Sequence, residues 1–368
     1  MLYQNIIIIG TGHIGSEVIR EISRSQGIAG NHQHPSRIVG IVNINNCFVL
    51  NKDSIQDDEY SEEKLLYSLK YESHPRINDG SYDDLLGDVE QAGWKFSEIV
   101  FIDVTADNRQ EVADLHKNVL KRWGKLVTAN KNPLSLFDMD TFRILTSDRN
   151  RYKYSVSVMA GAPGIDVLQK SYDTRNIVLS IEWCFSGTLS YLTSELESGK
   201  KLSVILSDAI KNGYTEPNPW DDLNGLDVAR KILILARTAG YVVNLSDITI
   251  TPFLPEKYSK YTRDTIASAV QSIDDEWTHR MHVLDSEWKT LRYIAKMNRE
   301  WDQVHISVWL EEVMKDHPLG LLKWTMNKIA ITTERAGIKI FEQAGAGISI
   351  TTQGILDDLA SLLDERTM

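Results

Sequence analysis

The chain has 368 residues, of which 42% are hydrophobic and 25% charged, and its formal net charge is −11 at pH 7. This length predicts one very large domain or two ordinary ones, and the composition is that of a soluble globular protein. The acidic balance excludes a protein built to bind a nucleic-acid backbone, because such proteins usually present a basic face.

Neither a membrane protein nor a secreted one is predicted. No apolar run approaches the roughly 18 residues needed to cross a bilayer. The N-terminal ten residues lack the basic region of a signal peptide. Cys47 and Cys184 are far apart and show no metal-type spacing. We therefore expect a reduced, cytoplasmic protein with no membrane partner.

A glycine-rich turn follows the first predicted strand, residues 5–9, and precedes a helical pattern over residues 16–22. Strand, glycine turn and helix in this order predict a dinucleotide-binding loop. The helix start offers free N–H groups and a partial positive charge to phosphates. A turn that serves packing alone is the alternative. The turn reads Gly10-Thr11-Gly12-His13-Ile14-Gly15.

The choice between NAD and NADP stays open. The second predicted strand, residues 37–42, ends in Asn43-Ile44-Asn45-Asn46. NAD-specific enzymes commonly carry a carboxylate there for the ribose hydroxyls, and its absence favours NADP or dual use. No arginine stands at this strand end for a 2′-phosphate. Lys52 is a weak candidate, and a solvated loop lysine is the simpler interpretation.

Two further strands, residues 98–104 and 125–128, end beside Thr105 and Lys131. Ligands of doubly wound sheets bind beyond the carboxyl ends of strands, so both residues are candidates for the cofactor site. The alternation of strands and helices changes character near residue 155, after a predicted strand over residues 152–157. We therefore predict an α/β fold, with a doubly wound nucleotide-binding domain at 1–154 and a second α/β domain at 155–344.

The stretch 214–231 collects acidic residues beside prolines and ends in Lys231. On a helix predicted for residues 225–239, Asp227 and Lys231 form an i,i+4 pair and share one arc with Arg230, Arg237 and Thr238. Spacing alone favours a solvated surface pair, worth about 0.2–0.5 kcal/mol. The alternative is a cleft whose carboxylates recognise an ammonium group and poise the lysine for proton transfer.

These motifs resemble the homoserine dehydrogenase family over nearly the whole chain, in the family's order and at plausible spacing. The stretch from Gly213 to Lys231 is the most specific of them. The matching segments are residues 10–15, 103–105, 128–134, 186–191, 213–231 and 345–347.

The resemblance implies reversible interconversion of L-homoserine and L-aspartate 4-semialdehyde with NADP or NAD, in threonine, methionine and isoleucine biosynthesis. It implies a Rossmann-type domain to which the C-terminal helix, 345–368, returns, and an α/β (α+β) substrate-binding and dimerisation domain at 155–344 whose sheet forms a homodimer. It also implies the short, monofunctional form, without a kinase or regulatory domain.

The resemblance also assigns roles to residues. Lys231 would exchange the proton of the substrate hydroxyl, with Lys131 near the reacting oxygen and Asp227 at the same end of the substrate. Glu216 would hold the amino group. The remaining substrate pocket would comprise Asp222, Thr188, Gly187 and Tyr214. The cofactor would contact Gly10, Thr11, Gly12, His13, Ile14, Gly15, Thr105, Lys131, Gly345 and Gly347.

The chain departs from the family at a cation site. Backbone carbonyls of Val158 and Ala160 would hold Na⁺ or K⁺, but Ser155 stands where the family usually has a glutamate, which puts the site in doubt. Two other functions stay open. One is a paralogous dehydrogenase acting on another small amino-acid aldehyde or alcohol, and the other is a catalytically silent nucleotide-binding sensor.

Overall fold

The structure is a computed structural model, and it describes residues 3–27, 36–54, 67–68, 74–75, 82–184, 186–301, 303–322, 326–344 and 347–362. The chain divides into two compact units. The first unit comprises Met1–Gly161 with Gly347–Met368, and the second is Ala162–Ala346. None of the helices in the described ranges is long and apolar enough to cross a membrane.

The first unit is built on a seven-stranded sheet in the order β4-β3-β2-β1-β5-β6-β7. Neighbours from β2 through β1, β5 and β6 to β7 pair in parallel, while β3 and β4 add antiparallel strands at one edge. The strand order reverses at β1, and ligands bind at such a switch point in doubly wound folds. The strands are β1 (Gln4–Ile9), β2 (Ser36–Val42), β3 (Asn46–Val49), β4 (His74–Pro75), β5 (Ile99–Asp103), β6 (Lys125–Thr128) and β7 (Tyr152–Lys153).

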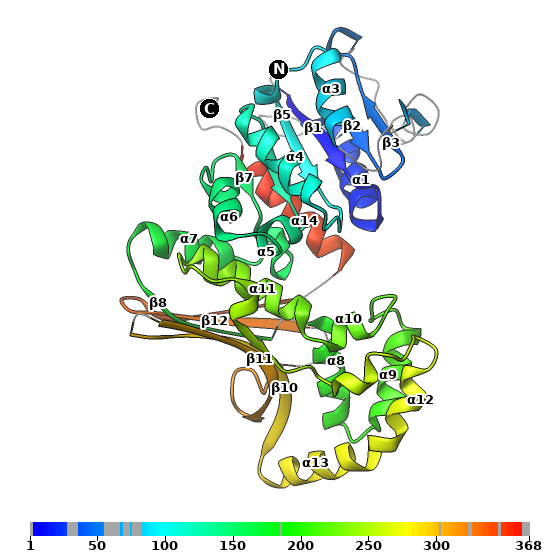
Figure 1. Cartoon of the computed structure of the whole chain (residues 1–368), viewed down its shortest axis with the longest axis vertical. Helices are drawn as coiled ribbons and strands as arrows, with labels where there is room; N and C mark the ends of the chain where they lie inside the picture. The colour runs from blue at the N-terminus through cyan, green and yellow to red at the C-terminus, as the bar shows by residue number, and fades with distance from the viewer. Residues whose placement is uncertain are drawn as a thin grey trace. The chain divides into compact units, whose positions relative to one another are not determined.

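Helices flank this sheet and bury its apolar strands. Ile6 to Ile9 of β1 are at most 1% exposed. Ile19 and Ile22 of α1 pack in the same cluster as Ile355 of α14, and Figure 1 shows α14 beside α1. The helices of this unit are α1 (His13–Gly27), α3 (Asp83–Gln91), α4 (Gln110–Lys121), α5 (Asn132–Ser135), α6 (Met139–Thr146) and α14 (Ile348–Ala360).

The strand predicted at residues 152–157 is wrong beyond Lys153. A 3-10 turn, η3 (Ser155–Ser157), replaces it. The Ser155 N–H donates to Asp358 Oδ2 on α14 at 3.1 Å, and the Ser157 N–H donates to the Tyr154 carbonyl at 3.1 Å. Because these groups bond to a helix side chain and to the turn itself, they are not available to a strand ladder.

The second unit contains a six-stranded sheet in the order β13-β12-β8-β10-β11-β9. All its pairs are antiparallel except β9 with β11. The strands are β8 (Val178–Cys184), β9 (Ile248–Ile250), β10 (Lys289–Glu300), β11 (Gln303–Met314), β12 (Met326–Thr333) and β13 (Gly337–Ala344). The helices are α7 (Gly164–Asp173), α8 (Gly187–Glu197), α9 (Leu202–Lys211), α10 (Trp220–Leu223), α11 (Leu226–Thr238), α12 (Ile266–Ala269) and α13 (Asp274–Ser286).

The two faces of this sheet differ in burial because side chains alternate along each strand. Ile331, Ile181 and Met297 stand opposite one another on β12, β8 and β10 and are fully buried. Figure 1 shows α7 and α11 along one face. The next row, which holds Glu182 and Lys296, is partly exposed. We call the face that carries Glu182 the outer face.

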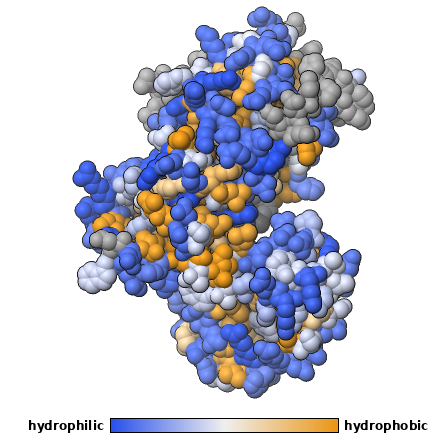
Figure 2. Space-filling model, viewed as in Figure 1, coloured by the Kyte–Doolittle hydropathy of each residue, from blue (hydrophilic) through white to orange (hydrophobic). Residues whose placement is uncertain are grey.

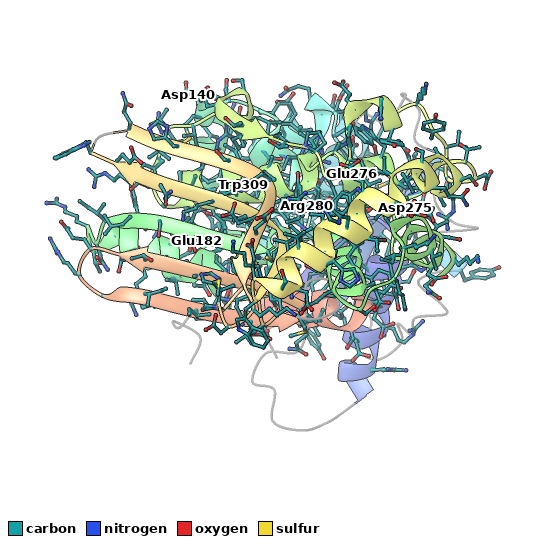
Figure 3. All side chains as sticks on the ribbon, turned by 90° about the horizontal axis from the view of Figure 1, so that it is seen from below. Asp140, Glu182, Asp275, Glu276, Arg280 and Trp309 are labelled. Carbon is teal, nitrogen blue, oxygen red and sulfur yellow. The ribbon has the colours of Figure 1, made fainter. Side chains whose placement is uncertain are left out.

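Helices α9, α12 and α13 complete the second unit. Figure 3 shows Asp275, Glu276 and Arg280 along α13, and it labels Glu182 on β8. Asp275 and Glu276 lie in the first turn of α13, where carboxylates stabilise the positive end of the helix dipole. In the view of Figure 2 the surface over α9, α12 and α13 is mainly hydrophilic.

Candidate active site

The glycine turn joins β1 to α1, and its three glycines differ in conformation and in their surroundings. Gly10 has φ +106°, a left-handed conformation that side chains rarely adopt. A Cβ at Gly15 would lie 2.0 Å from the Gly10 carbonyl oxygen, so the helix start can approach the turn only without one. A Cβ at Gly12 would meet nothing within 4 Å, which leaves the turn open on that side.

A cavity of about 780 Å³ opens at this turn. That volume lies in the range of about 300–1,000 Å³ usual for small-molecule and cofactor sites. All of its described lining residues belong to the first unit; Tyr82 lies at the start of α3, and the others lie at or just after the carboxyl ends of β1, β2 and β5. They are Ile9, Gly10, Thr11, Gly12, Val42, Asn43, Ile44, Asn45, Tyr82, Thr105, Ala106, Asp107 and Arg109.

Asp107 and Arg109 form an ion pair on the wall of this cavity. Arg109 Nη2 donates to Asp107 Oδ2 at 2.6 Å and Arg109 Nε to Oδ1 at 3.0 Å, while the Tyr82 hydroxyl donates to Oδ2 at 3.0 Å. Burial acts to raise the pKa of Asp107, but the hydrogen bonds from Arg109 and Tyr82 outweigh it, so the pKa lies below its usual value. The pair is therefore ionised at neutral pH.

A buried polar chain behind the cavity holds Thr105 in place. Asp103 Oδ1 accepts hydrogen bonds from Thr105 N at 2.9 Å and Thr105 Oγ1 at 2.7 Å. Its Oδ2 lies 3.0 Å from His116 Nε2, and His116 Nδ1 lies 3.0 Å from the Tyr152 hydroxyl. Asp103 and His116 are fully buried, and burial raises the pKa of Tyr152. The network links β5, α4 and β7 to a residue that lines the cavity.

Lys131 follows β6 in a loop that is tied to the same cavity wall. Asn130 Nδ2 donates to Thr105 Oγ1 at 3.2 Å and to the Asp107 carbonyl at 2.9 Å. Asn132 Nδ2 donates to the Ala106 carbonyl at 3.0 Å. Lys131 lies between these two anchors as the N-cap of α5, and it is half-buried.

In the second unit, α11 begins at a position that only glycine can occupy. Gly225 is the N-cap of α11 and has φ +76°. A Cβ there would lie 2.0 Å from the Tyr293 hydroxyl oxygen, which itself donates to the Thr251 carbonyl at 2.8 Å. This close approach fixes the start of the helix that carries Asp227 and Lys231.

A compact hydrogen-bonded group stands beside that helix start. Thr188 Oγ1, in the first turn of α8, lies 3.0 Å from Asp222 Oδ1 and 2.5 Å from the Tyr214 carbonyl. Asp222 Oδ2 accepts from Glu216 N at 2.8 Å. Burial is the main cause that raises the pKa of Asp222 to about 6; the hydrogen bonds from Glu216 N and Thr188 act against it, and the negative charges of Glu216 and Asp227 act with it. The group is short of positive charge.

Lys231 and Asp227 form a half-buried ion pair. The Nζ–Oδ2 distance is 2.8 Å, and the side chains are 15% and 33% exposed. The solvated surface that spacing alone favours is therefore wrong for this helix. Arg237 and Thr238, on the same predicted arc, are buried, with Arg237 Nε donating to the Val243 carbonyl at 3.0 Å and Thr238 Oγ1 to the Ile234 carbonyl at 2.7 Å.

The segment proposed for a cation lies in the first unit. Met159 and Ala160 have φ +56° and +48°, and Gly161 has φ +91°. A Cβ at Gly354 of α14 would lie 2.7 Å from the Ala160 carbonyl oxygen, so this strained turn packs tightly on α14. No cluster of three or more His, Cys, Asp or Glu side chains suited to a metal occurs among the residues that the structure describes.

A sequence model of the homoserine dehydrogenase family matches residues 163–360. These are more than half of the 368 residues. The chain belongs to the homoserine dehydrogenase family.

Curated relatives agree with this family over almost the whole chain. The homoserine dehydrogenase of Schizosaccharomyces pombe is 29% identical over 98% of this chain and 96% of its own length. The chloroplastic bifunctional aspartokinase/homoserine dehydrogenase 2 of Zea mays is 30% identical over 96% of this chain. This chain spans 38% of the length of the Zea mays protein.

Solved structures share the fold. A crystal structure of a Candida auris protein of unknown function has a TM-score of 0.83 and 26% identity, and the match covers 99% of both chains. A hyperthermophilic archaeal homoserine dehydrogenase in complex with NADPH has a TM-score of 0.70 and 18% identity, and the match covers 98% of this chain and 97% of the other. The archaeal likeness bears on the fold alone.

Among the residues that the structure describes, only some of the predicted cofactor residues line the cavity. Gly10, Thr11, Gly12 and Thr105 line the cavity. His13 begins α1 and is exposed, whereas Ile14 packs against the core. Gly347 is the N-cap of α14, and Gly345 lies outside the described residues.

Five polar residues that line the cavity are not among the predicted cofactor contacts, although two of them, Asn43 and Asn45, lie at the strand end that bears on the cofactor choice. The five are Asn43, Asn45, Tyr82, Asp107 and Arg109. No arginine stands at the end of β2, but Arg109, which follows β5, lines the same cavity as Asn43. The strand-end rule that selected Thr105 could have reached Arg109, four residues further on. Lys52 is not a solvated loop lysine, since its Nζ pairs with Glu98 at 2.8 Å.

Proposed function

We propose that this chain is a homoserine dehydrogenase that interconverts L-homoserine and L-aspartate 4-semialdehyde with NADP or NAD, in the biosynthesis of threonine, methionine and isoleucine. The observation that carries the proposal is the half-buried Lys231–Asp227 pair next to Asp222, in a member of this family. A zwitterionic amino alcohol needs carboxylates for its ammonium group and a proton acceptor for its hydroxyl.

The first unit would hold the cofactor. The open side of the turn at Gly12 and the start of α1 suit a pyrophosphate, because backbone N–H groups and the helix dipole favour an anion there. Thr105, fixed by Asp103, and the anchored loop that carries Lys131 would bound the nicotinamide end. When bound, NADP or NAD accepts the hydride from the substrate carbon.

The second unit would hold the amino acid. Glu216 and Asp222 would bind the ammonium group, with Thr188, Gly187 and Tyr214 lining the pocket. Lys231, as the neutral amine, would take the hydroxyl proton as the hydride leaves and return it in the reverse direction. Asp227 would orient this amine and stabilise the ammonium that forms, through the 2.8 Å contact with its Nζ. Lys131 would act as the second lysine near the reacting oxygen.

The test of this function is a steady-state assay with homoserine, run with NADP and with NAD and compared with shorter and longer amino alcohols. We expect the highest kcat/KM with homoserine. A clear preference for another amino alcohol would identify the chain as a paralogous dehydrogenase that acts on that alcohol. Nucleotide binding without oxidation of any amino alcohol would identify a silent sensor.

A homodimer is part of the proposal, formed through the outer face of the six-stranded sheet. On β13, Ile338 and Ile340 are 61% and 45% exposed and stand opposite Thr332 and Ala330. Exposed β-branched apolar side chains on a sheet face favour burial against a partner. A second copy of the chain would present the same surface and so form a closed pair.

The cytoplasmic location and the cation site also remain proposals. The acidic net charge and the two buried cysteines, which form no disulfide, are compatible with a reducing compartment. At the cation segment, Asp358 brings a buried carboxylate to the backbone of Ser155, at 3.1 Å. It is a candidate substitute for the glutamate that Ser155 replaces.

A further inference from the structure

One side of the cavity in the first unit is formed by residues outside the glycine turn. Asn43 and Asn45 line it after β2, and Asp107 and Arg109 line it after β5. In dinucleotide-binding folds the adenosine ribose lies beyond the second strand, and the residues there distinguish a 2′-hydroxyl from a 2′-phosphate. These side chains are therefore placed to decide between NAD and NADP.

Asn43 supplies no negative charge to this region. Its Oδ1 accepts hydrogen bonds from Asn45 N at 2.9 Å and Asn46 N at 2.7 Å, which hold the turn between β2 and β3. An aspartate could make the same two bonds and would add the charge that binds ribose hydroxyls and repels a phosphate. With asparagine at this position a phosphate meets no such repulsion.

Among the described residues that line the cavity, Asp107 is the one with a carboxylate. Both of its carboxylate oxygens already accept hydrogen bonds from the protein. Oδ1 accepts from Arg109 N and Nε, both at 3.0 Å, and Oδ2 accepts from Arg109 Nη2 and the Tyr82 hydroxyl. Asp107 is therefore an anchor for Arg109 and a poor acceptor for ribose hydroxyls.

Arg109 combines a fixed orientation with access to the cavity. Asp107 holds one edge of the guanidinium, while the side chain is still 40% exposed. A guanidinium presents five donors in a planar fork that matches phosphate geometry. We propose that Arg109 binds the 2′-phosphate of NADP and that, with Asn43 in place of a carboxylate, it makes NADP the preferred cofactor.

The inference rests on the proposed NAD(P)-dependent function, so the first test measures binding without turnover. Calorimetry with 2′,5′-ADP and 5′-AMP should show tighter binding of 2′,5′-ADP. Loss of a charged hydrogen bond predicts that Arg109→Ala weakens 2′,5′-ADP binding about 10- to 100-fold and leaves 5′-AMP binding nearly unchanged. Equal losses with both probes would place Arg109 against the adenine and overturn the inference.

Matched variants separate recognition from folding. Arg143→Ala removes another exposed arginine of the first unit that pairs with an aspartate, Asp140, at 3.4 Å, and should leave both probes unaffected. Asn43→Asp keeps the turn and adds a charge, so it should shift the preference towards 5′-AMP even if Arg109→Ala fails to fold. An unchanged preference in Asn43→Asp would contradict the inference.

Kinetics then distinguish the two proposals. If wild-type protein oxidises homoserine and favours NAD, the cofactor inference fails while the proposed function stands. If it prefers 2′,5′-ADP but oxidises no homoserine, the function fails while the cofactor inference stands.

Discussion

Asp222 is held between Thr188 and Glu216, and burial raises its pKa to about 6. The Asp222 carboxyl group therefore binds a proton more tightly in the folded protein than in the unfolded chain, where the pKa of an aspartate is about 3.9. The stabilisation from this proton is lost as the pH rises from about 4 to about 6, and it does not change above that range. A bound ammonium group favours the ionised form.

This protonation predicts a pH dependence of substrate use. We expect kcat/KM for homoserine to fall as the pH is lowered through about 6, because kcat/KM reports ionisations of the free enzyme. Asp222→Asn should remove this inflection and raise the KM for homoserine at every pH. Asp221→Asn changes an exposed neighbour and should retain it. A wild-type profile that is flat between pH 5 and 7, a range of about one unit either side of the ionisation, would contradict the assignment.

At the scale of single elements, α11 shows where sequence patterns are informative and where they fail. The i,i+4 spacing of Asp227 and Lys231 predicts that they meet, and they do. The same periodicity assigns Arg237 and Thr238 to a polar surface, but both are buried. Arg237 donates to the carbonyl of Val243, and such a tertiary contact leaves no periodic trace in the sequence.

Among the other elements, too, the sequence predicts some and fails to predict others. The β-branched run at β1 and the glycines after it predict the nucleotide-binding turn, because the geometry depends on local residues. Four-residue β3 is too short to leave a pattern. Arg109 escapes prediction because its place in the cavity depends on how the segments after β2 and β5 converge.

The start of α11 gives a test at this scale. In Gly225→Ala the added Cβ would meet the Tyr293 hydroxyl at 2.0 Å, in addition to the left-handed φ. Gly199→Ala is a matched control, since Gly199 also has positive φ (+83°) but nothing lies within 4 Å. The control should cost about 1–2 kcal/mol in the free energy of unfolding, from the backbone conformation alone. We expect Gly225→Ala to cost more in denaturant unfolding and to lower activity; equal costs would show that the contact with Tyr293 yields easily.

At the scale of the whole molecule, the chain comprises two compact units, and the proposed function gives each unit its own task. The residues that line the proposed nucleotide cavity belong to the unit that includes α14, and the proposed substrate residues belong to the six-stranded unit. The proposed function connects the two tasks in one enzyme.

The outer face predicts the oligomeric state. Sedimentation should give a mass near twice 41.8 kDa for the wild-type chain. Ile340→Lys places a charge on the outer face and should shift the protein towards monomer, whereas Val242→Lys, at a position that is 65% exposed and lies outside the sheet, should not. A monomeric wild-type protein at assay concentrations would contradict the proposed interface.

The central claim is that Lys231 exchanges a proton with homoserine while the nucleotide takes a hydride. The most direct measurement is homoserine-dependent reduction of NADP by wild type, Lys231→Ala and Lys200→Ala, together with NADPH binding by fluorescence. Lys200 is an exposed lysine that pairs with Glu195 and serves as the control. Loss of acid–base catalysis predicts that kcat falls about 10²- to 10⁴-fold in Lys231→Ala, with NADPH binding unchanged and Lys200→Ala fully active. Near-normal turnover in Lys231→Ala, or no homoserine oxidation by wild type with either nucleotide, would contradict the account.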